Sequence, residues 1–227
     1  MRHRFFVDAD LAPGGTVPLD AAERHHARVV RAREGEEVEV FNGRGAGFFG
    51  VFGENAIRIT APAPDREAPA AIALAMAIIQ LDKFELVVQK ATELGVRAIV
   101  PLVTDRVELR AERYRGKHDR WRKIAFEAVK QSGRTLIPTI AEPTEFRDAV
   151  AREGAKIIFD ADASPSTSQL SNSSTLFIGP EGGWSDEELR LAREHGCAFQ
   201  RLGPRRLRAE TAAIVATAII AARCGGF

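Results

Sequence analysis

Short apolar runs punctuated by glycines fill the first sixty residues of the chain. Runs of strand length occur at residues 4–7, 16–19, 38–41, 48–52 and 56–59. Glycines between positions 43 and 50 are typical of the turns that join such strands. Residues 20–33 have helical character instead, because Asp20 can cap the first turn and Gly35 follows the end. The pattern predicts a small β-rich domain with one helix.

A proline-rich connection follows this β-rich part. Three prolines lie within residues 62–69. Prolines at this spacing disfavour helix and keep the chain stiff and extended. We therefore place a domain boundary here and divide the chain into residues 1–68 and residues 69–227.

Beyond this boundary, apolar runs alternate with segments of helical spacing. Runs typical of buried strands occur at residues 72–79, 98–103, 156–160 and 175–179. Helical spacing occurs at residues 84–94, 117–131 and 144–153. Strands that alternate with helices are typical of a largely parallel sheet covered by helices on both faces. Residues 161–174 contain six serines and are expected to form a surface loop.

The segment after residue 175 contains the most specific motif. The predicted strand runs into the turn Gly179-Pro180-Glu181-Gly182-Gly183, and Ser185 with Glu188 then predicts a capping box at a helix start. Such a turn presents backbone N–H groups to a ligand at the carboxyl edge of a sheet. It is neither a dinucleotide fingerprint nor a P-loop, because G-x-G-x-x-G and G-K-[ST] are absent. Taken alone, it is better explained as a structural turn that requires glycine.

A second glycine turn, Gly203-Pro204, follows a predicted strand at residues 199–202. A basic run at residues 205–208 then leads into a helix that begins at Glu210. This helix is apolar almost all round, so it must be buried on several sides. Its partner is either the core of the same chain or a second subunit, since its alanines permit close approach of another helix.

The composition is that of a globular protein, with 45% apolar and 28% charged residues in a chain of 227. The two cysteines, Cys197 and Cys224, have no metal-ligand spacing. Neither a signal peptide nor an apolar run of about 18 residues is recognisable. We therefore expect a cytoplasmic protein without a metal ion and without a membrane partner.

Positive charge is concentrated in two stretches, although the net charge is only +1. Residues 106–134 carry ten lysines and arginines against four acids, and residues 201–208 carry four arginines and no acid. Clustered cations are typical of proteins that bind a phosphate backbone. For the first stretch, a solvated helix face with ion pairs is an equally good explanation.

In combination, these motifs resemble the RsmE family of SPOUT-class RNA methyltransferases. The resemblance rests on Ile178-Gly179-Pro180-Glu181-Gly182-Gly183-Trp184-Ser185, on Leu202-Gly203, on Leu207-Arg208-Ala209-Glu210-Thr211-Ala212 and, upstream, on Gln89-Lys90-Ala91-Thr92-Glu93-Leu94-Gly95-Val96 and Gln131-Ser132-Gly133-Arg134. It covers nearly the whole chain, and several ordered motifs at compatible spacing are more specific than any one of them.

The resemblance implies a fold and a reaction. The fold is a PUA-like RNA-binding β-barrel followed by an α/β SPOUT domain with a C-terminal trefoil knot, in a homodimer. The reaction is methylation of N3 of a uridine, U1498, in 16S ribosomal RNA within an assembled 30S subunit. The cofactor is S-adenosyl-L-methionine, and its product is S-adenosyl-L-homocysteine. Nothing in the periodicity of the chain reveals a knot.

The resemblance also implies a cofactor pocket made of four segments. Carried over position by position, these segments contain Leu102, Val103, Thr104, Ile178, Gly179, Pro180, Glu181, Gly182, Gly183, Leu202, Gly203, Leu207, Arg208, Ala209, Thr211 and Ala212.

Transfer to N3 of uracil requires loss of the N3 proton, helped by a base or by stabilisation of the charge on O2 and O4. Arginines suit the second task, so we expect Arg106 and Arg208 near the base or a phosphate, with Glu210 as a base or as a partner of an arginine. The cations expected to bind RNA are Arg2, Arg4, Arg31, Arg120, Arg134, Arg205 and Arg206.

One position departs from the family pattern. Family members often carry an acid where this chain has Lys130. A catalytic role of that acid would be lost here, and the position is better explained as peripheral.

Three other functions stay open. A ribose 2′-O-methyltransferase would use a similar scaffold. A non-catalytic RNA-binding protein of ribosome assembly would keep the fold without the cofactor, although the complete set of glycine turns argues against it. An unrelated nucleotide-binding α/β enzyme would explain the first turn but not residues 207–212.

Overall fold

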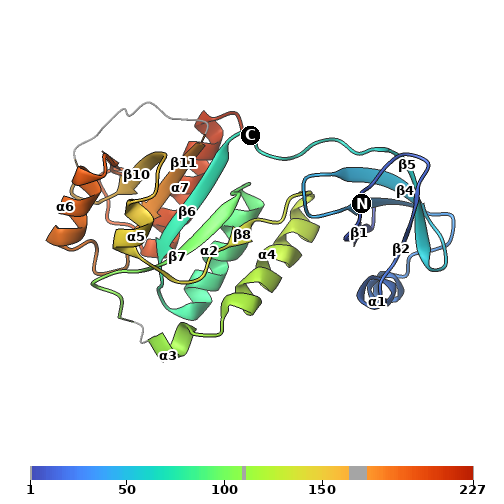
Figure 1. Ribbon diagram of the computed structural model, residues 1–227, viewed down its shortest axis with the longest axis horizontal. Helices are drawn as coiled ribbons and strands as arrows, with labels where there is room; N and C mark the ends of the chain where they lie inside the picture. The colour runs from blue at the N-terminus through green and yellow to red at the C-terminus, as the bar shows by residue number, and fades with distance from the viewer. Residues whose placement is uncertain (1, 109–110, 164–172, 227) are drawn as a thin grey trace. The chain divides into compact units, whose positions relative to one another are not determined.

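The computed structural model describes residues 2–108, 111–163 and 173–226, which fold into two compact units (Figure 1). The first unit runs to Glu67 and also contains Val129–Ile137. The second contains Ala68–Ala128 and the chain from Pro138 onward. The first unit is therefore not one continuous stretch of sequence, whereas the division expected from the sequence was continuous.

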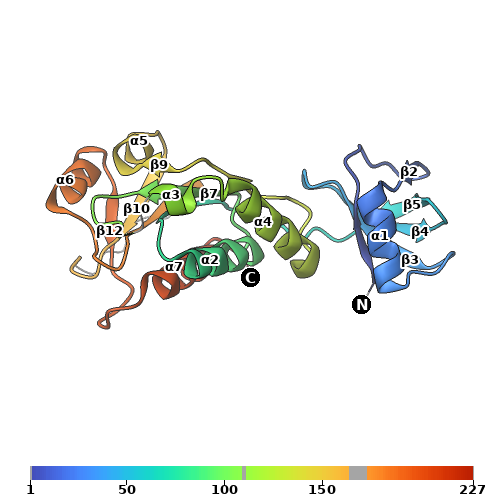
Figure 2. The same ribbon diagram turned by 90° about the horizontal axis from the view of Figure 1, so that it is seen from below.

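The first unit is a five-stranded sheet with one helix. Its elements are β1 (Arg4–Phe6), β2 (Thr16–Pro18), α1 (Ala21–Val30), β3 (Glu37–Phe41), β4 (Gly47–Phe52) and β5 (Ala56–Pro62), in the sheet order β1-β3-β4-β5-β2. Only the β1–β3 pair is parallel. Figure 2 shows α1 against this sheet, where Ala27 joins a core of Phe5, Val38 and Ile57.

The boundaries of α1 differ at one end from the prediction. As expected, Asp20 caps the helix by accepting a hydrogen bond from the backbone N–H of Glu23 at 2.7 Å. The helix ends at Val30 because Arg31 adopts a left-handed conformation with φ of 56°. A residue in that conformation cannot continue a right-handed helix, so the predicted extension to residue 33 is wrong.

Hydrogen bonds hold the segment Val129–Ile137 in the first unit. The guanidinium of Arg4 donates to the carbonyl oxygens of Val129 at 2.8 Å and Arg134 at 2.7 Å. The backbone N–H of Gly45 donates to Thr135 at 3.1 Å, and that of Ile137 donates to the Gly43 carbonyl at 2.9 Å. These partners are far apart in sequence, so apolar periodicity could not have assigned the segment to this unit.

The second unit is built on a parallel sheet, as predicted. Its strands are β6 (Ala71–Ala77), β7 (Ala98–Val103), β8 (Thr139–Ile140), β9 (Thr144–Glu145), β10 (Ala155–Phe159), β11 (Ser173–Ile178) and β12 (Ala198–Gln200). Their order is β12-β10-β11-β6-β7-β8, and β9 also pairs with β7. All of these pairings are parallel.

Helices cover both faces of this sheet. They are α2 (Leu81–Glu93), α3 (Ala111–Tyr114), α4 (His118–Ser132), α5 (Phe146–Val150), α6 (Asp186–Glu194) and α7 (Ala209–Arg223). Figure 2 shows α2 and α7 on one face and α5 and α6 on the other. Two separate apolar cores lie between these helices and the sheet. No helix in the described ranges is long and apolar enough to cross a membrane.

One prediction about the second unit is wrong, and another falls mostly on residues outside the described ranges. The helix expected at residues 144–153 is only Phe146–Val150, because Thr144–Glu145 forms β9 and pairs with the end of β7. Residues 164–172 of the serine-rich loop lie outside the described residues, and Ser173 and Ser174 already belong to β11.

The helix α7 packs within its own chain along one side. Ala213, Ala216, Ile220 and Ala221 are fully buried and contact the core that α2 shares. Ile219, by contrast, is 36% exposed. Packing within the chain therefore explains most of the apolar character of α7, and the homodimer stays a prediction.

Candidate active site

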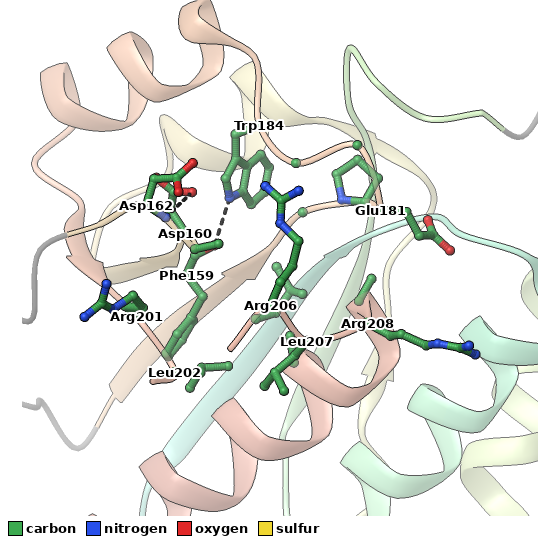
Figure 3. A pocket seen from close by; sticks show the side chains of 18 of the residues that line it. Phe159, Asp160, Asp162, Glu181, Trp184, Arg201, Leu202, Arg206, Leu207 and Arg208 are labelled. Atoms are coloured by element: carbon green, nitrogen blue, oxygen red, sulfur yellow. Dashed lines mark hydrogen bonds between the residues drawn. The ribbon is translucent and has the colours of Figure 1, made fainter. Parts of the chain in front are cut away.

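A cavity of about 740 Å³ lies at the carboxyl edge of the parallel sheet. Its walls are the chain after β10, the glycine turn after β11, and the connection between β12 and α7 (Figure 3). Parallel strands end at the same edge, so three separate turns converge there. A cavity of this size suits a small molecule.

The glycines of the first turn have two different purposes. Gly183 has a φ of 71°, and its N–H donates to the Pro180 carbonyl at 2.9 Å. A Cβ on Gly179 would lie 3.1 Å from the Trp184 ring, and one on Gly182 would lie 3.3 Å from the Cβ of Arg106. Gly183 therefore satisfies a backbone requirement, whereas Gly179 and Gly182 provide space beside the cavity.

Trp184 forms a fixed wall of the cavity. Its side chain is buried, and its Nε1–H donates to the Phe159 carbonyl at 3.0 Å, as Figure 3 shows. It also packs against Phe146. The indole thus ties the glycine turn to the end of β10. The other tryptophan, Trp121, is fully buried against Phe84, so it belongs to the core.

The loop after β7 is fastened to the same turn. The guanidinium of Arg106 donates to the Gly182 carbonyl at 2.9 Å. The Ser185 hydroxyl donates to Asp105 at 2.5 Å, and Glu188 accepts the backbone N–H of Asp105 at 3.0 Å. Arg106 therefore lines the cavity and holds the glycine turn in place.

Glu188 is a buried carboxylate beside this junction. It forms the predicted capping box with Ser185. Burial raises its pKa, and the backbone N–H groups of Ser185 and Asp105 only partly offset this. Glu188 joins the loop after β7 to the start of α6 through these two backbone N–H groups. It does not line the cavity.

Most predicted cofactor residues meet at this cavity. Those that line it are Ile178, Gly179, Pro180, Glu181, Gly182, Gly183, Leu202, Gly203, Leu207, Arg208, Ala209 and Ala212. Gly203 has a φ of 108°, which favours glycine at this turn. In Figure 3, Leu202 and Leu207 lie together on one side of the cavity.

Four predicted cofactor residues do not line the cavity. Leu102 is fully buried in the core beneath α5, and Val103 packs against the other core. Thr104 is buried, and its Oγ1 has no hydrogen-bond partner within the described residues. Thr211 is exposed on α7. The positions of these four residues along β7 and around α7 therefore place their side chains outside the cavity lining.

The three predicted catalytic residues are separated. Arg106 and Arg208 line the cavity. Glu210 does not, and its Oε2 is buried without a hydrogen-bond partner among the described residues. The prediction that Glu210 acts at the site as a base is therefore not supported by its position.

The wall formed after β10 was not predicted from the sequence. Phe159, Asp160, Ala161 and Asp162 line the cavity, together with Asp186, Leu189, Arg193 and Arg201. The backbone N–H of Asp160 donates to the Gln200 carbonyl at 3.0 Å, which joins this wall to the end of β12. The predicted parallel strand at residues 156–160 was a usable signal, since its carboxyl end had to reach this edge.

Two of the predicted RNA-binding arginines are interior residues. The side chain of Arg134 is 3% exposed and pairs with Glu67 at 2.8 Å. That of Arg4 is 11% exposed and pairs with Glu39 at 3.1 Å. Both predictions are corrected, because these guanidinium groups are engaged inside the first unit.

The other predicted RNA-binding residues lie at the surface. Arg2 pairs with Glu37 at 2.6 Å, and Arg120 forms a bidentate pair with Glu85. Arg31 is exposed. Arg205 and Arg206 are exposed residues that line the cavity. Only the last two are thus brought to the candidate site.

Lys130 has a structural partner. Its Nζ lies 2.8 Å from Glu23 Oε1, and both side chains are almost fully buried in the first unit. The position is outside the cavity, in agreement with the peripheral interpretation.

Comparisons with known proteins agree with this arrangement. A family model described as an RNA methyltransferase domain matches residues 66–221, and one described as an RNA methyltransferase PUA domain matches residues 19–53. Ribosomal RNA small subunit methyltransferase E from Rickettsia conorii is 30% identical over 234 residues, which cover 95% of this chain and 93% of that protein. Its counterpart from Synechocystis is 32% identical and covers 97% of this chain and 77% of that protein.

Two solved structures share the fold over nearly the full length. Ribosomal RNA small subunit methyltransferase E from Neisseria gonorrhoeae, bound to S-adenosyl methionine, superposes with a TM-score of 0.89 at 30% identity. A methyltransferase from Legionella pneumophila in complex with the same cofactor gives 0.84 at 34% identity. In both cases, 98% of each chain is covered.

Proposed function

The chain belongs to the RsmE family of SPOUT-type RNA methyltransferases with a PUA domain, and from this premise we propose that it methylates N3 of a uridine in 16S ribosomal RNA. The cofactor is S-adenosyl-L-methionine, the target is U1498, and the substrate is an assembled 30S subunit. A particle is favoured over free RNA because recognition by shape requires a preformed surface.

The observation that carries this proposal is the cavity built from the glycine turn and residues 201–209. Gly179 and Gly182 allow Trp184 and Arg106 to pack closely against the turn that lines the cavity. The apolar side chains of Leu202 and Leu207 line one part of the cavity, and the carboxylates of Asp160 and Asp162 line another (Figure 3). This mixture suits a ligand that joins an adenosine to a positively charged amino-acid moiety.

In this proposal, the residues that line the cavity have different roles. When bound, the cofactor supplies an activated methyl group. Arg106 keeps the glycine turn in shape through the Gly182 carbonyl. Arg208 stabilises the charge that develops on the uracil oxygens as the N3 proton passes to water, because a guanidinium donates to oxyanions in a fixed geometry.

Stabilisation of charge is favoured over a dedicated base. Arg205, Arg206 and Arg208 are exposed, line the cavity and form no ion pair with any residue that the structure describes. Glu210, the carboxylate expected to act as a base, does not line the cavity. In this proposal, these arginines therefore stabilise the charge on the uracil oxygens.

The test is product analysis after incubation of the protein with unmethylated 30S subunits and labelled cofactor. Nuclease digestion and mass spectrometry should place the added methyl group on the uracil base at U1498. A shift on the ribose would overturn the N3 assignment in favour of 2′-O-methylation. Comparison with protein-free 16S RNA shows whether the particle is required.

A matched pair of variants tests the cavity. Gly182→Trp should abolish calorimetric binding of S-adenosylmethionine because the indole fills the space beside Arg106. Ala151→Trp adds the same side chain at an exposed position that does not line the cavity and should bind normally. If the folded parent protein does not bind the cofactor, the alternative of a non-catalytic RNA-binding protein gains support.

A further inference from the structure

The first basic stretch of the chain forms a surface whose charges are not used internally. Residues 111–123 contain six lysines and arginines against two acids. Arg113, Arg115, Arg122 and Lys123 are exposed, and none of them pairs with a carboxylate in the part of the chain that the structure describes. We name these four residues the α3–α4 cation patch. Among the described lysines and arginines of residues 111–123, the interpretation as a face with ion pairs applies to Arg120, which pairs with Glu85.

The patch does not serve the stability of the helices that carry it. Arg122 and Lys123 lie in the first two turns of α4, and that end of a helix carries a partial positive charge. The contacts that hold these elements come from other residues, since Tyr114 and Trp121 are buried in the core. Clustered like charges repel one another, so an external anion is the partner that this arrangement fits.

The patch is also connected to the cavity by a short piece of chain. Arg106 lines the cavity, and α3 begins at Ala111. Five residues span at most about 18 Å. An extended polyanion that enters the cavity can therefore also reach the start of α3 within the second unit.

We propose that the α3–α4 cation patch is a docking surface for the phosphate backbone of the substrate RNA, in addition to the arginines at the cavity. This inference rests on the proposed function, because an RNA substrate is what makes a phosphate backbone the partner. Guanidinium groups bind phosphate through paired donors, and exposed side chains can do so without losing an existing ion pair. The acids Glu112 and Asp119 share the stretch and limit its net charge to +4.

The test compares two quadruple variants that remove the same charge. The patch variant carries Arg113→Gln, Arg115→Gln, Arg122→Gln and Lys123→Gln. The control variant carries Arg44→Gln, Arg147→Gln, Arg152→Gln and Arg190→Gln, which are exposed arginines on other elements. Affinity for a labelled 20-base-pair RNA duplex is measured between 50 and 200 mM salt, and methylation of 30S subunits is measured in parallel.

The patch variant should bind the duplex about tenfold or more weakly, and its log–log salt slope should fall by about 3, since each phosphate contact contributes about 0.7 to 0.9. Its KM for 30S subunits should rise while kcat and cofactor affinity stay within about twofold. The control variant should show neither the loss of affinity nor the fall in slope.

The outcomes separate this inference from the proposed function. Methylation by the parent protein together with an unchanged salt slope and KM in the patch variant would overturn the inference alone. A patch-dependent slope in a protein that methylates no 30S subunits would support the docking surface and reject the proposed reaction. Loss of slope in both variants would show a general charge effect and overturn the inference.

Discussion

At the scale of single residues, the contact that Arg106 makes indicates a different role from the one expected from its chemistry. The sequence suggested an arginine near the reacting base, but its guanidinium donates to the Gly182 carbonyl at 2.9 Å. That bond fixes a loop which a ligand must touch. Arg106 is therefore a positioning residue, and its effect should appear in cofactor affinity.

Replacement of Arg106 by methionine tests this role. Met keeps the apolar stem but removes the donor, so loss of about 1 kcal/mol should weaken cofactor binding roughly fivefold. Arg106→Lys should restore part of the affinity because it can still donate. Arg152→Met, at an exposed position outside the cavity, provides the calorimetric control. A large fall in kcat with normal cofactor affinity would instead indicate contact with the reacting atoms.

Glu67 gives a prediction about pH. Burial raises the pKa of this carboxyl, but the Arg134 guanidinium and the backbone N–H groups of Leu136 and Thr135 outweigh burial and hold the pKa below the ordinary glutamate value. The unfolded chain then binds more protons in the intervening window, so this stabilisation is complete above about pH 4.3 and is lost as pH falls through the folded pKa.

Glu67→Gln should therefore destabilise the first unit by about 3 kcal/mol at pH 7, because it breaks a buried pair. The cost should shrink as pH falls from about 4.3 toward the lowered pKa of Glu67 in the folded protein, because the unfolded chain takes up its proton first and the stabilisation by the charge is lost. Urea unfolding, followed by circular dichroism at pH 7 and at acid pH, measures how the free energy of unfolding differs between the variant and the parent protein. Glu37→Gln serves as the control, since that side chain is 52% exposed. An equal cost at both pH values would contradict the assignment.

At the scale of elements, local signals predicted some boundaries and tertiary contacts set the others. The capping box of Ser185 and Glu188 is a local pattern, and the structure confirms it. The helix α5 is shorter than predicted because Thr144–Glu145 pairs with β7, a contact that helical periodicity does not encode. The wall after β10 lies beside the glycine turn because β10 pairs in parallel with β11, so both strands end at the same edge of the sheet.

The docking of Val129–Ile137 on the first unit leads to an element-scale prediction. A Cβ on Gly47, at the start of β4, would lie 2.6 Å from the Cγ2 of Thr135. Gly47→Ala should therefore destabilise the protein by about 1–3 kcal/mol through overpacking. Thr135→Ser removes that methyl group and should recover most of the loss in the double variant.

The double-mutant cycle measures this contact directly. The coupling energy should be about 1 kcal/mol or more, because the two residues touch. Thr135→Ser alone provides the comparison, since it removes the methyl group without adding an atom beside Gly47. Simple additivity of the two substitutions would show that the segment does not pack against β4 as described.

At the scale of the whole molecule, the sequence predicted two units and a parallel sheet in the second, but not how the chain is distributed between them. The change from glycine-punctuated strands to strand–helix alternation carries that information. The return of Val129–Ile137 to the first unit depends on pairs such as Arg134 with Glu67 and Lys130 with Glu23. No local pattern identifies those partners, and the knot and the dimer implied by the family resemblance stay predictions for the same reason.

The division into two units has a consequence for ligand binding, because both tryptophans, Trp121 and Trp184, belong to the second unit. Tryptophan fluorescence therefore reports unfolding of the unit that contains the cavity. S-adenosylmethionine at about 100 times its Kd should raise the free energy of unfolding of that unit by about 2.7 kcal/mol.

The change of fluorescence on binding should come from Trp184, which walls the cavity, and not from Trp121 in the core. Trp121→Phe should therefore keep this change, whereas Trp184→Phe should lose it even where calorimetry shows binding. The opposite pattern would place the ligand away from the glycine turn.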